Sequence, residues 1–402
     1  MPGWLVLMGA LAALGPLAID MYLPAFGHMA DELQVPQGLV ERTLASYLLG
    51  LALAQLLYGP LADRYGRRLP LLGGLALFTV ASLACATSQD IGHLTAWRVV
   101  QAFGGAAGMV VPRAVIRDHL DTRQAAQALS LLMLVMGVMP ILAPLLGGQA
   151  VMLGSWRLVF YLMAGAGALL GLAVLLRMEE SLAPERRTPL AVRTILHNFG
   201  HLLAHRGFMG YSLAGGLGTA GMFAYIAGSP LVFIDLYGID PRWFGLLFGL
   251  NALCLIVAAQ FSARLLNRHR PLALLMRAQF TLVLMTLAAL ALTLLGWINL
   301  PLLMLCLMGF MASQGFVGPN SAALALAEQG PRLGTASALM GSMQMFCGAA
   351  AGLAISLWHT DSPLPLTAVL AACALLSWLS GRFGMRHDRR RTQAADAADR
   401  LD

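Results

Sequence analysis

The chain has 402 residues, of which 58% are hydrophobic and 11% charged, and its net charge is +7. Soluble domains carry about 25% charged residues, so this chain is expected to cross a membrane many times. All 26 basic residues are arginines. The lack of lysine excludes the P-loop lysine of an ATP-driven pump and the Schiff-base lysine of several enzyme classes.

Apolar runs of about 20 residues mark the expected membrane spans. The sequence predicts twelve, and hence an all-α membrane protein with spans at 4–27, 42–62, 69–87, 92–113, 126–150, 156–176, 208–230, 243–265, 271–293, 298–325, 333–357 and 364–384. The longest polar interruption follows the sixth run. We therefore expect an N-terminal six-helix bundle at 1–176, a cytosolic linker at 177–207, a C-terminal six-helix bundle at 208–384 and a cytosolic tail at 385–402.

The placement of the arginines predicts the orientation in the membrane. Of the 26, 21 fall in the loops after even-numbered spans or in the C-terminal tail. The other five are Arg42, Arg157 and Arg242 in the opposite loops, and Arg98 and Arg277 inside spans. By the positive-inside rule both termini and the linker are expected in the cytosol. The positive charge is thus explained by topology, and nucleic-acid binding is not expected.

The expected linker contains "HNFGHLLAH", with His197, His201 and His205 spaced four residues apart. Such a stripe on a helix is one arrangement that binds a metal ion. The alternative is an amphipathic segment on the membrane surface. Because no cysteine or carboxylate joins the stripe, the second interpretation is favoured and no metal is expected.

The stretch "GPLADRYGRR" follows the second expected span. Gly59 permits close helix packing. Asp63 stands among arginines, so it must be paired or lie at a helix end. Gly66 allows a tight turn before Arg67 and Arg68, which suit lipid headgroups. The spacing resembles the signature loop of the major facilitator superfamily, and the resemblance implies that Asp63 locks the inner end of the N-terminal half against a helix end or Arg113.

Two further stretches carry the same resemblance. "LTAWRVVQAFGGAAG" in the fourth span and "GVMPILAPLLGG" in the fifth are similar to the superfamily's second and third motifs, the latter typical of drug:proton antiporters. "IDMYLPAF" in the first span resembles the bicyclomycin/chloramphenicol resistance (Bcr/CflA) branch. The resemblance implies a conformational role for Gly59, Asp63, Arg64, Gly66, Arg67, Arg68, Arg113, Gly137, Pro140, Pro144, Gly147 and Gly148.

Asp20 is the only acidic residue predicted inside a span, and intramembrane carboxylates usually carry function. A rise of 1.5 Å per residue puts Asp20 about 9 Å and Arg98 about 10 Å below the outer ends of their spans. The resemblance implies that both spans line a central cavity. We therefore expect Asp20 and Arg98 to pair, with protonation of Asp20 weakening the pair and coupling transport to protons. The alternative is a permanent ion pair that only fixes packing.

The remaining cavity is expected to be apolar and aromatic with a few polar groups, although helix packing is an alternative for each residue. The candidates are Tyr22, Tyr47, Gln101, Met136, Phe223, Tyr225, Asn251, Gln314, Asn320 and Gln344. The resemblance implies a monomeric inner-membrane antiporter, not an enzyme, that uses the proton gradient and no cofactor to expel amphipathic drugs such as chloramphenicol or bicyclomycin. A proton-coupled exporter of a sugar or nucleoside is the alternative, because fold does not settle substrate.

Overall fold

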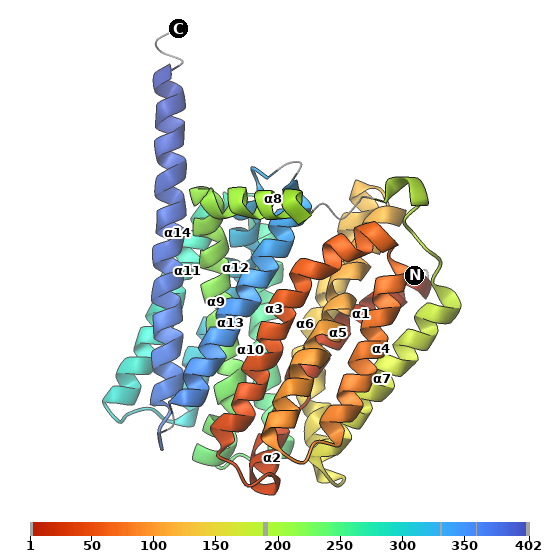
Figure 1. Cartoon of the computed structure of the whole chain (residues 1–402). Helices are drawn as coiled ribbons and strands as arrows, with labels where there is room; N and C mark the ends of the chain where they lie inside the picture. The colour runs from red at the N-terminus through yellow and green to blue at the C-terminus, as the bar shows by residue number, and fades with distance from the viewer. Residues whose placement is uncertain (1–2, 188–191, 330–331, 359, 399–402) are drawn as a thin grey trace. The chain divides into compact units, whose positions relative to one another are not determined.

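We analysed a computed structural model, which describes residues 3–187, 192–329, 332–358 and 360–398. Over these residues all regular structure is helical (Figure 1). The α-helices are α1 (Gly3–Asp20), α2 (Phe26–Glu32), α3 (Gln37–Tyr65), α4 (Arg68–Ala86), α5 (Ile91–His119), α6 (Thr122–Met152), α7 (Trp156–Arg177), α8 (Val192–Ala204), α9 (Arg206–Pro230), α10 (Pro241–Leu265), α11 (Pro271–Leu294), α12 (Leu300–Leu326), α13 (Leu333–Leu357) and α14 (Leu364–Ala398). Short 3₁₀ turns η1 (Leu23–Ala25) and η2 (Pro184–Arg186) and a π-helical turn η3 (Leu231–Leu236) complete the elements.

Twelve helical segments among the described residues are long and apolar enough to cross a membrane, which confirms the predicted number. The first span, Gly3–Glu32, is discontinuous and comprises α1, η1 and α2. The seventh, Arg206–Leu236, joins α9 to η3. Amphipathic helix α8 is additional and lies within the predicted linker.

Several helices begin where the sequence supplies a polar cap. The side chain of Asp90 accepts a hydrogen bond from the backbone N–H of His93 at the start of α5, over 2.9 Å. Asp121 accepts from Gln124 in the same way at the start of α6, over 2.8 Å. These caps satisfy backbone donors that the first turn of a helix leaves free, so the loops between spans are short and sharply defined.

The chain forms two compact units. Unit 1 contains residues 1–190, 226–253 and 352–361; unit 2 contains residues 191–225, 254–351 and 362–402. In unit 1, α5 packs on α3 and α4, and α1 packs on α5 and α6; in unit 2, α11 packs on α12 and α14. This division follows contacts rather than chain order, and the predicted two bundles of six with a linker at 177–207 stay a prediction.

Small residues permit these close packings, as expected for helices in lipid. In unit 1, a Cβ on Gly104 of α5 would overlap the backbone of Phe78 in α4. In unit 2, a Cβ on Gly315 of α12 would lie 2.5 Å from the carbonyl oxygen of Leu255 in α10. The glycines therefore bring helix backbones into contact within each unit.

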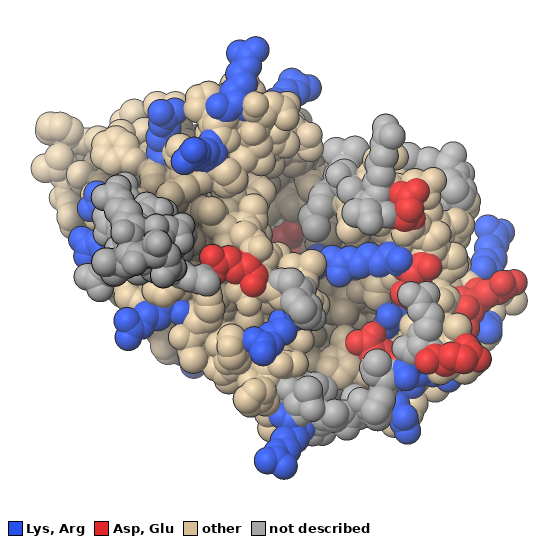
Figure 2. Space-filling model, turned by 90° about the horizontal axis from the view of Figure 1, so that it is seen from above, with Lys and Arg blue, Asp and Glu red and all other residues tan. Residues whose placement is uncertain are grey.

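Figure 2 looks onto the face at the top of Figure 1, where α3 ends and α4 begins. Basic side chains are spread widely over this face, with fewer acidic ones. All are arginines, because the sequence has no lysine. The positive-inside rule predicts that loops rich in arginine lie in the cytosol. The orientation itself stays a prediction.

Candidate functional site

Asp20 lies at a break in the first membrane span. Helix α1 ends at Asp20, and η1 begins with Leu23 and Pro24. Proline has no N–H to donate to the preceding turn, so it stops the α-helix here. The Asp20 side chain is only 2% exposed, and its Oδ1 has no hydrogen-bond partner among the described residues. A buried carboxyl oxygen without a hydrogen-bond partner among the described residues therefore lies next to the break between α1 and η1.

Gly147 of α6 packs directly on this break. A Cβ built on Gly147 would overlap the carbonyl oxygen of Met21, the residue after Asp20. On α1 itself, a Cβ on Gly15 would lie 2.7 Å from the sulfur of Met109 in α5. The broken span is therefore held between α5 and α6, and no larger residue fits at Gly147 without a shift.

Arg98 of α5 is completely buried, with a relative exposure of 0%. One guanidinium nitrogen donates to Gln101 Oε1 over 2.6 Å and the other to the carbonyl oxygen of Ala18 over 3.0 Å. The rings of Tyr22 and Tyr47 each lie 4.2 Å from the guanidinium carbon. Cation–π contacts of this kind stabilise a desolvated cation by about 2 kcal/mol.

The expected ion pair between Asp20 and Arg98 is not formed in this structure. No ion pair in the described part of the chain joins them. The physical reason is that Arg98 binds the backbone of Ala18, two residues before Asp20, and that aromatic rings cover its face. Both residues are buried and Arg98 contacts the backbone near Asp20, but their side chains do not point at each other as predicted.

The polar residues around Arg98 form one network. Gln101 Nε2 donates to Ser82 Oγ over 2.7 Å, and a longer contact of 3.7 Å reaches the sulfur of Met163. The hydroxyl groups of Tyr22 and Thr43 lie 3.3 Å apart. Tyr22 of the first span, Tyr47 of α3 and Gln101 of α5, which the sequence analysis named as separate candidates, therefore all contact Arg98.

The other candidates for a substrate cavity lie in both units. Met136 and Asn251 belong to unit 1, and a second group belongs to unit 2: Phe223, Tyr225, Gln314, Asn320 and Gln344. Asn320 donates to Ser262 Oγ over 2.9 Å and to the carbonyl oxygen of Phe316 over 2.8 Å. For Asn320 these contacts support the alternative of interhelical hydrogen bonding. A role of the others in substrate binding stays a proposal.

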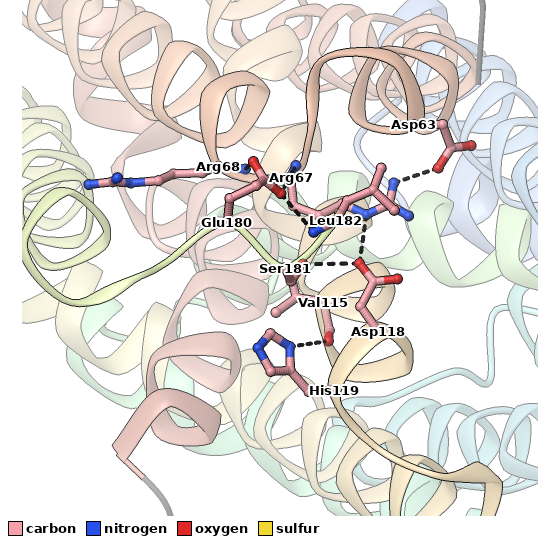
Figure 3. Close-up of polar contacts among 9 residues, drawn as sticks. All are labelled: Asp63, Arg67, Arg68, Val115, Asp118, His119, Glu180, Ser181 and Leu182. Carbon is pink, nitrogen blue, oxygen red and sulfur yellow. Dashed lines mark hydrogen bonds and ion pairs between the residues drawn. The ribbon is translucent and has the colours of Figure 1, made fainter. Parts of the chain in front are cut away.

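The Asp63 turn (residues 59–68) connects α3 to α4 (Figure 3). Arg67 forms ion pairs with Asp63 at 2.5 Å and with Asp118 at 2.9 Å. Ser181 donates to the same Asp118 carboxylate over 3.0 Å. Burial opposes the charge on Arg67, but the two carboxylates raise its pKa above the ordinary value. Arg67 therefore ties the end of α3 to the end of α5.

Glu180 closes the turn from the segment after α7 (Figure 3). Its carboxylate accepts from the backbone N–H groups of Arg67 at 2.7 Å, Arg68 at 3.1 Å and Leu182 at 3.0 Å. Burial opposes ionisation, but these hydrogen bonds lower the pKa of Glu180. Gly66 has φ of 88°, and a Cβ there would overlap the Glu180 carboxylate. Glycine is therefore favoured at position 66 for two reasons, the positive φ and the contact with Glu180.

Of the two partners expected for Asp63, a helix end or Arg113, the structure shows the first. The ion pair of Asp63 is with Arg67, which caps the start of α4, and not with Arg113. The Nε of Arg113 has no hydrogen-bond partner among the described residues. A Cβ on Gly59 would meet no atom within 4 Å, so close helix packing does not require this glycine. Arg64 is exposed, and Arg68 donates to the carbonyl oxygen of Leu175 over 2.6 Å.

The fifth-span motif lies in α6, which continues through Pro140 and Pro144. A Cβ on Gly148 would come within 3.1 Å of the carbonyl oxygen of Pro241, also in unit 1. Together with the contact of Gly147 on Met21, this agrees with the expected close approach of backbones. Gly137 lies one turn before Pro140 on the same helix.

Sequence reasoning missed three acidic residues. Glu41 is fully buried in α3, because this helix starts five residues before the predicted span at 42. Glu180 was overlooked because its partners are more than 100 residues away. Glu32, at the end of α2, contacts Trp156 and Arg157 of α7. The only available signal was their position next to the ends of apolar runs.

The histidine stripe lies on and just after α8 and contacts protein groups in unit 2. Arg332 donates to His201 Nδ1 over 2.9 Å. His205 accepts from the backbone N–H of Phe208 over 3.0 Å and lies 3.5 Å from a carboxylate oxygen of Glu328. Within the described residues no group of three histidine, cysteine or acidic side chains is arranged to hold a metal ion.

Twelve candidate spans, a discontinuous first span and a polar group buried within it are typical of a multi-pass membrane transporter. The family model "Major Facilitator Superfamily" matches residues 8–354, and the chain belongs to this superfamily. The prediction of the superfamily is confirmed. The protein is therefore a transporter and not an enzyme, and it belongs to the bacterial inner membrane.

Similar proteins agree with this assignment. The uncharacterized MFS-type transporter YdgK of Bacillus subtilis (strain 168) is 37% identical over 385 residues, which cover 95% of each chain. The bicyclomycin resistance protein homolog of Haemophilus influenzae is 31% identical over 390 residues, 94% of this chain and 95% of that one. The crystal structure of a D-xylose-proton symporter has a TM-score of 0.74 at 14% identity, covering 93% and 96% of the chains, and shows the likeness of fold alone.

Proposed function

We propose that this protein exports small amphipathic drugs, including chloramphenicol- and bicyclomycin-like antibiotics, across the bacterial inner membrane in exchange for protons. The bicyclomycin resistance protein homolog and the multidrug resistance protein MdtL of Klebsiella pneumoniae, 31% identical over 375 residues, support a drug substrate and the Bcr/CflA branch. Twelve spans without a lysine for ATP binding support an ion gradient as the energy source.

The observation that most supports the proposal is the buried carboxyl oxygen of Asp20, which has no hydrogen-bond partner among the described residues. Ionisable groups in membrane spans are costly and mark ion pathways or ligand sites. The Asp20 side chain is buried where α1 ends, and one of its carboxyl oxygens has no hydrogen-bond partner among the described residues. Either a proton or a hydrogen-bond donor of the drug satisfies this oxygen. Because the two compete for one group, drug release and proton binding are coupled, which is antiport.

Arg98 supplies the fixed positive charge of the site. An arginine stays protonated throughout the cycle, and its two terminal nitrogens donate to Gln101 and Ala18. It therefore holds the carbonyl of Ala18 and the rings of Tyr22 and Tyr47 in place. In the proposed cycle Asp20 exchanges the proton, while Arg98 stabilises the carboxylate form through space.

In the proposed cycle, the two bundles at 1–176 and 208–384 rock about the site as a monomer, with both termini in the cytosol. The Asp63 turn and the glycines of α6 act in this motion. The turn joins the ends of α3, α4 and α5, and Gly147 joins α6 to the break. When the bundles change from one packing to the other, the contacts of the turn and of Gly147 must either break or stay intact as a whole.

Flux in liposomes tests the proposal. Purified protein is reconstituted, a pH gradient is imposed, and the transport of chloramphenicol, bicyclomycin, a sugar and a nucleoside is measured. The expected result is drug flux that follows the sign of the gradient. Gradient-driven flux of the sugar or nucleoside without drug flux would establish the alternative, a metabolite exporter. Antibiotic susceptibility of a pump-deleted host that expresses the protein then gives the substrate range.

A further inference from the structure

Glu32 joins three segments of unit 1 at the end of the first span. Its Oε2 accepts from Trp156 Nε1 over 2.7 Å, and its Oε1 forms an ion pair with Arg157. Arg157 also donates to the carbonyl oxygen of Ser88 over 3.2 Å and lies 4.3 Å above the Trp156 ring. We call Glu32, Trp156 and Arg157 the Glu32 clamp. It connects α2, the start of α7 and the loop after α4.

A column of aromatic rings leads from this clamp to Arg98. The ring centroids of Trp156 and Phe160, one turn apart on α7, lie 6.0 Å apart in an edge-to-face arrangement. Phe160 lies 5.9 Å from Tyr22, which covers the guanidinium of Arg98. Phe26, the first residue of α2, packs edge-on against Tyr22 at 5.0 Å. The clamp therefore reaches Tyr22 along two routes, through α7 and through α2.

The members of the column are tightly enclosed. Trp156 is 1% exposed, and Phe160, Tyr22 and Arg98 are 0% exposed. Interiors packed to this degree transmit a displacement, because no void is available to absorb it. By contrast, the carboxylate of Glu32 is 48% exposed. An exposed ion pair contributes little to stability by itself. The pair of Glu32 with Arg157 therefore matters mainly because it fixes the positions of the segments that it joins.

We propose that Glu32 is a positioning residue for the Asp20–Arg98 site. It acts through Trp156, Phe160 and Tyr22 and fixes the short helix α2 that follows the break. This inference rests on the proposed function insofar as it assigns the site to transport. The inference adds to the site a residue at the end of the span, Glu32, which is distant in sequence from Arg98. Removal of this side chain alters the site although Glu32 itself does not contact the drug.

Transport kinetics separate positioning from simple stabilisation. Glu32→Ala removes both contacts, and KM for the drug is expected to rise about fivefold with little change in kcat, because ground-state geometry is lost. Trp156→Phe keeps an aromatic ring, smaller than the indole, but removes the N–H donor, and should give a similar rise. The double variant should be no worse than either single variant, since both break one linkage. Glu32→Gln keeps an oxygen that can accept from Trp156 and should restore most of the affinity.

Asp31→Ala is the matched control, because Asp31 is an exposed acid on the same helix beside Glu32 and makes no contact with the clamp in the described structure. It should leave KM unchanged. Hydrogen exchange of the protein without substrate provides a second readout. Glu32→Ala should accelerate exchange at residues 20–26, and Asp31→Ala should not. If Glu32→Ala does not fold, Trp156→Phe carries both measurements.

The two measurements distinguish this inference from the proposed function. Absence of drug flux by the wild-type protein would contradict the proposed function, while exchange at the break would still test the linkage. Wild-type exchange at residues 20–26 in a folded Glu32→Ala protein would overturn the inference. So would a wild-type KM in that variant, or additive effects of Glu32→Ala and Trp156→Phe.

Discussion

At the scale of single residues, Asp20 offers a direct test of coupling. Asn has nearly the same shape as a protonated aspartic acid but cannot release a proton. Asp20→Asn should therefore abolish efflux driven by a pH gradient while passive exchange of a neutral drug survives. Flux in liposomes against imposed pH measures both. Asp20→Glu keeps the acid and is the control expected to retain partial activity. Full gradient-driven efflux by the Asn variant would place coupling elsewhere.

Gly147 offers a test of packing at the same site. In Gly147→Ala the new Cβ meets the carbonyl oxygen of Met21, and a backbone atom cannot move aside as a flexible side chain can. Overpacking of this kind costs about 1–3 kcal/mol. Thermal stability in detergent should fall and efflux should be largely lost, although the protein still inserts.

Gly59→Ala is the matched change in another motif glycine. Its Cβ would meet no atom within 4 Å, and alanine favours a helix over glycine by about 1 kcal/mol. This variant should be as stable as the wild type or slightly more stable. An equal loss of thermal stability in both variants would show that packing on Met21 is not the reason for glycine at 147.

At the scale of elements, the Asp63 turn depends on Glu180. The pKa of Glu180 lies below its ordinary value of 4.5, so its contribution to stability is present above about pH 4.5 and is lost as the pH falls through the lowered pKa. Glu180→Gln removes that contribution at every pH. The melting temperatures of wild type and variant should therefore differ at pH 7 and converge once the pH has fallen below the lowered pKa of Glu180.

The expected difference corresponds to about 1 kcal/mol, below the range of about 1.5–3 kcal/mol for hydrogen bonds to charged groups, because the Glu180 side chain is exposed. Glu179→Gln is the control. Glu179 is the neighbouring exposed acid and takes no part in the contacts of the turn. A pH-dependent difference of equal size in Glu179→Gln would attribute the effect to net charge and not to the turn.

The elements also show what a sequence can and cannot predict. Spans follow from apolar runs of about 20 residues, so all twelve were found. The break after Asp20 was not, because the apolar run continues through Pro24 and hydropathy does not report backbone breaks. The Glu180 contacts and the direction of Arg98 depend on partners distant in sequence. Periodicity gives the depth of a side chain, whereas its partner is set by tertiary packing.

At the scale of the whole molecule, the arginines predict which ends of the spans face the cytosol. The direction of the proposed antiport is set by the proton gradient, which drives drug out of the cell as protons enter. The charge bias is strong, because 21 arginines lie on the predicted cytosolic side and three on the other. The positive-inside rule counts charges in short loops close to the ends of the spans, and the loops of this chain are of that kind.

Reporter fusions test the predicted orientation. Alkaline phosphatase is active only outside the cytosol, and green fluorescent protein exported in an unfolded state stays dark. Phosphatase joined after Asp90, in the loop between α4 and α5, should be active. Phosphatase joined after Arg187, following α7, should be inactive, while green fluorescent protein at the same position should be fluorescent. The opposite result at both positions would invert the predicted topology.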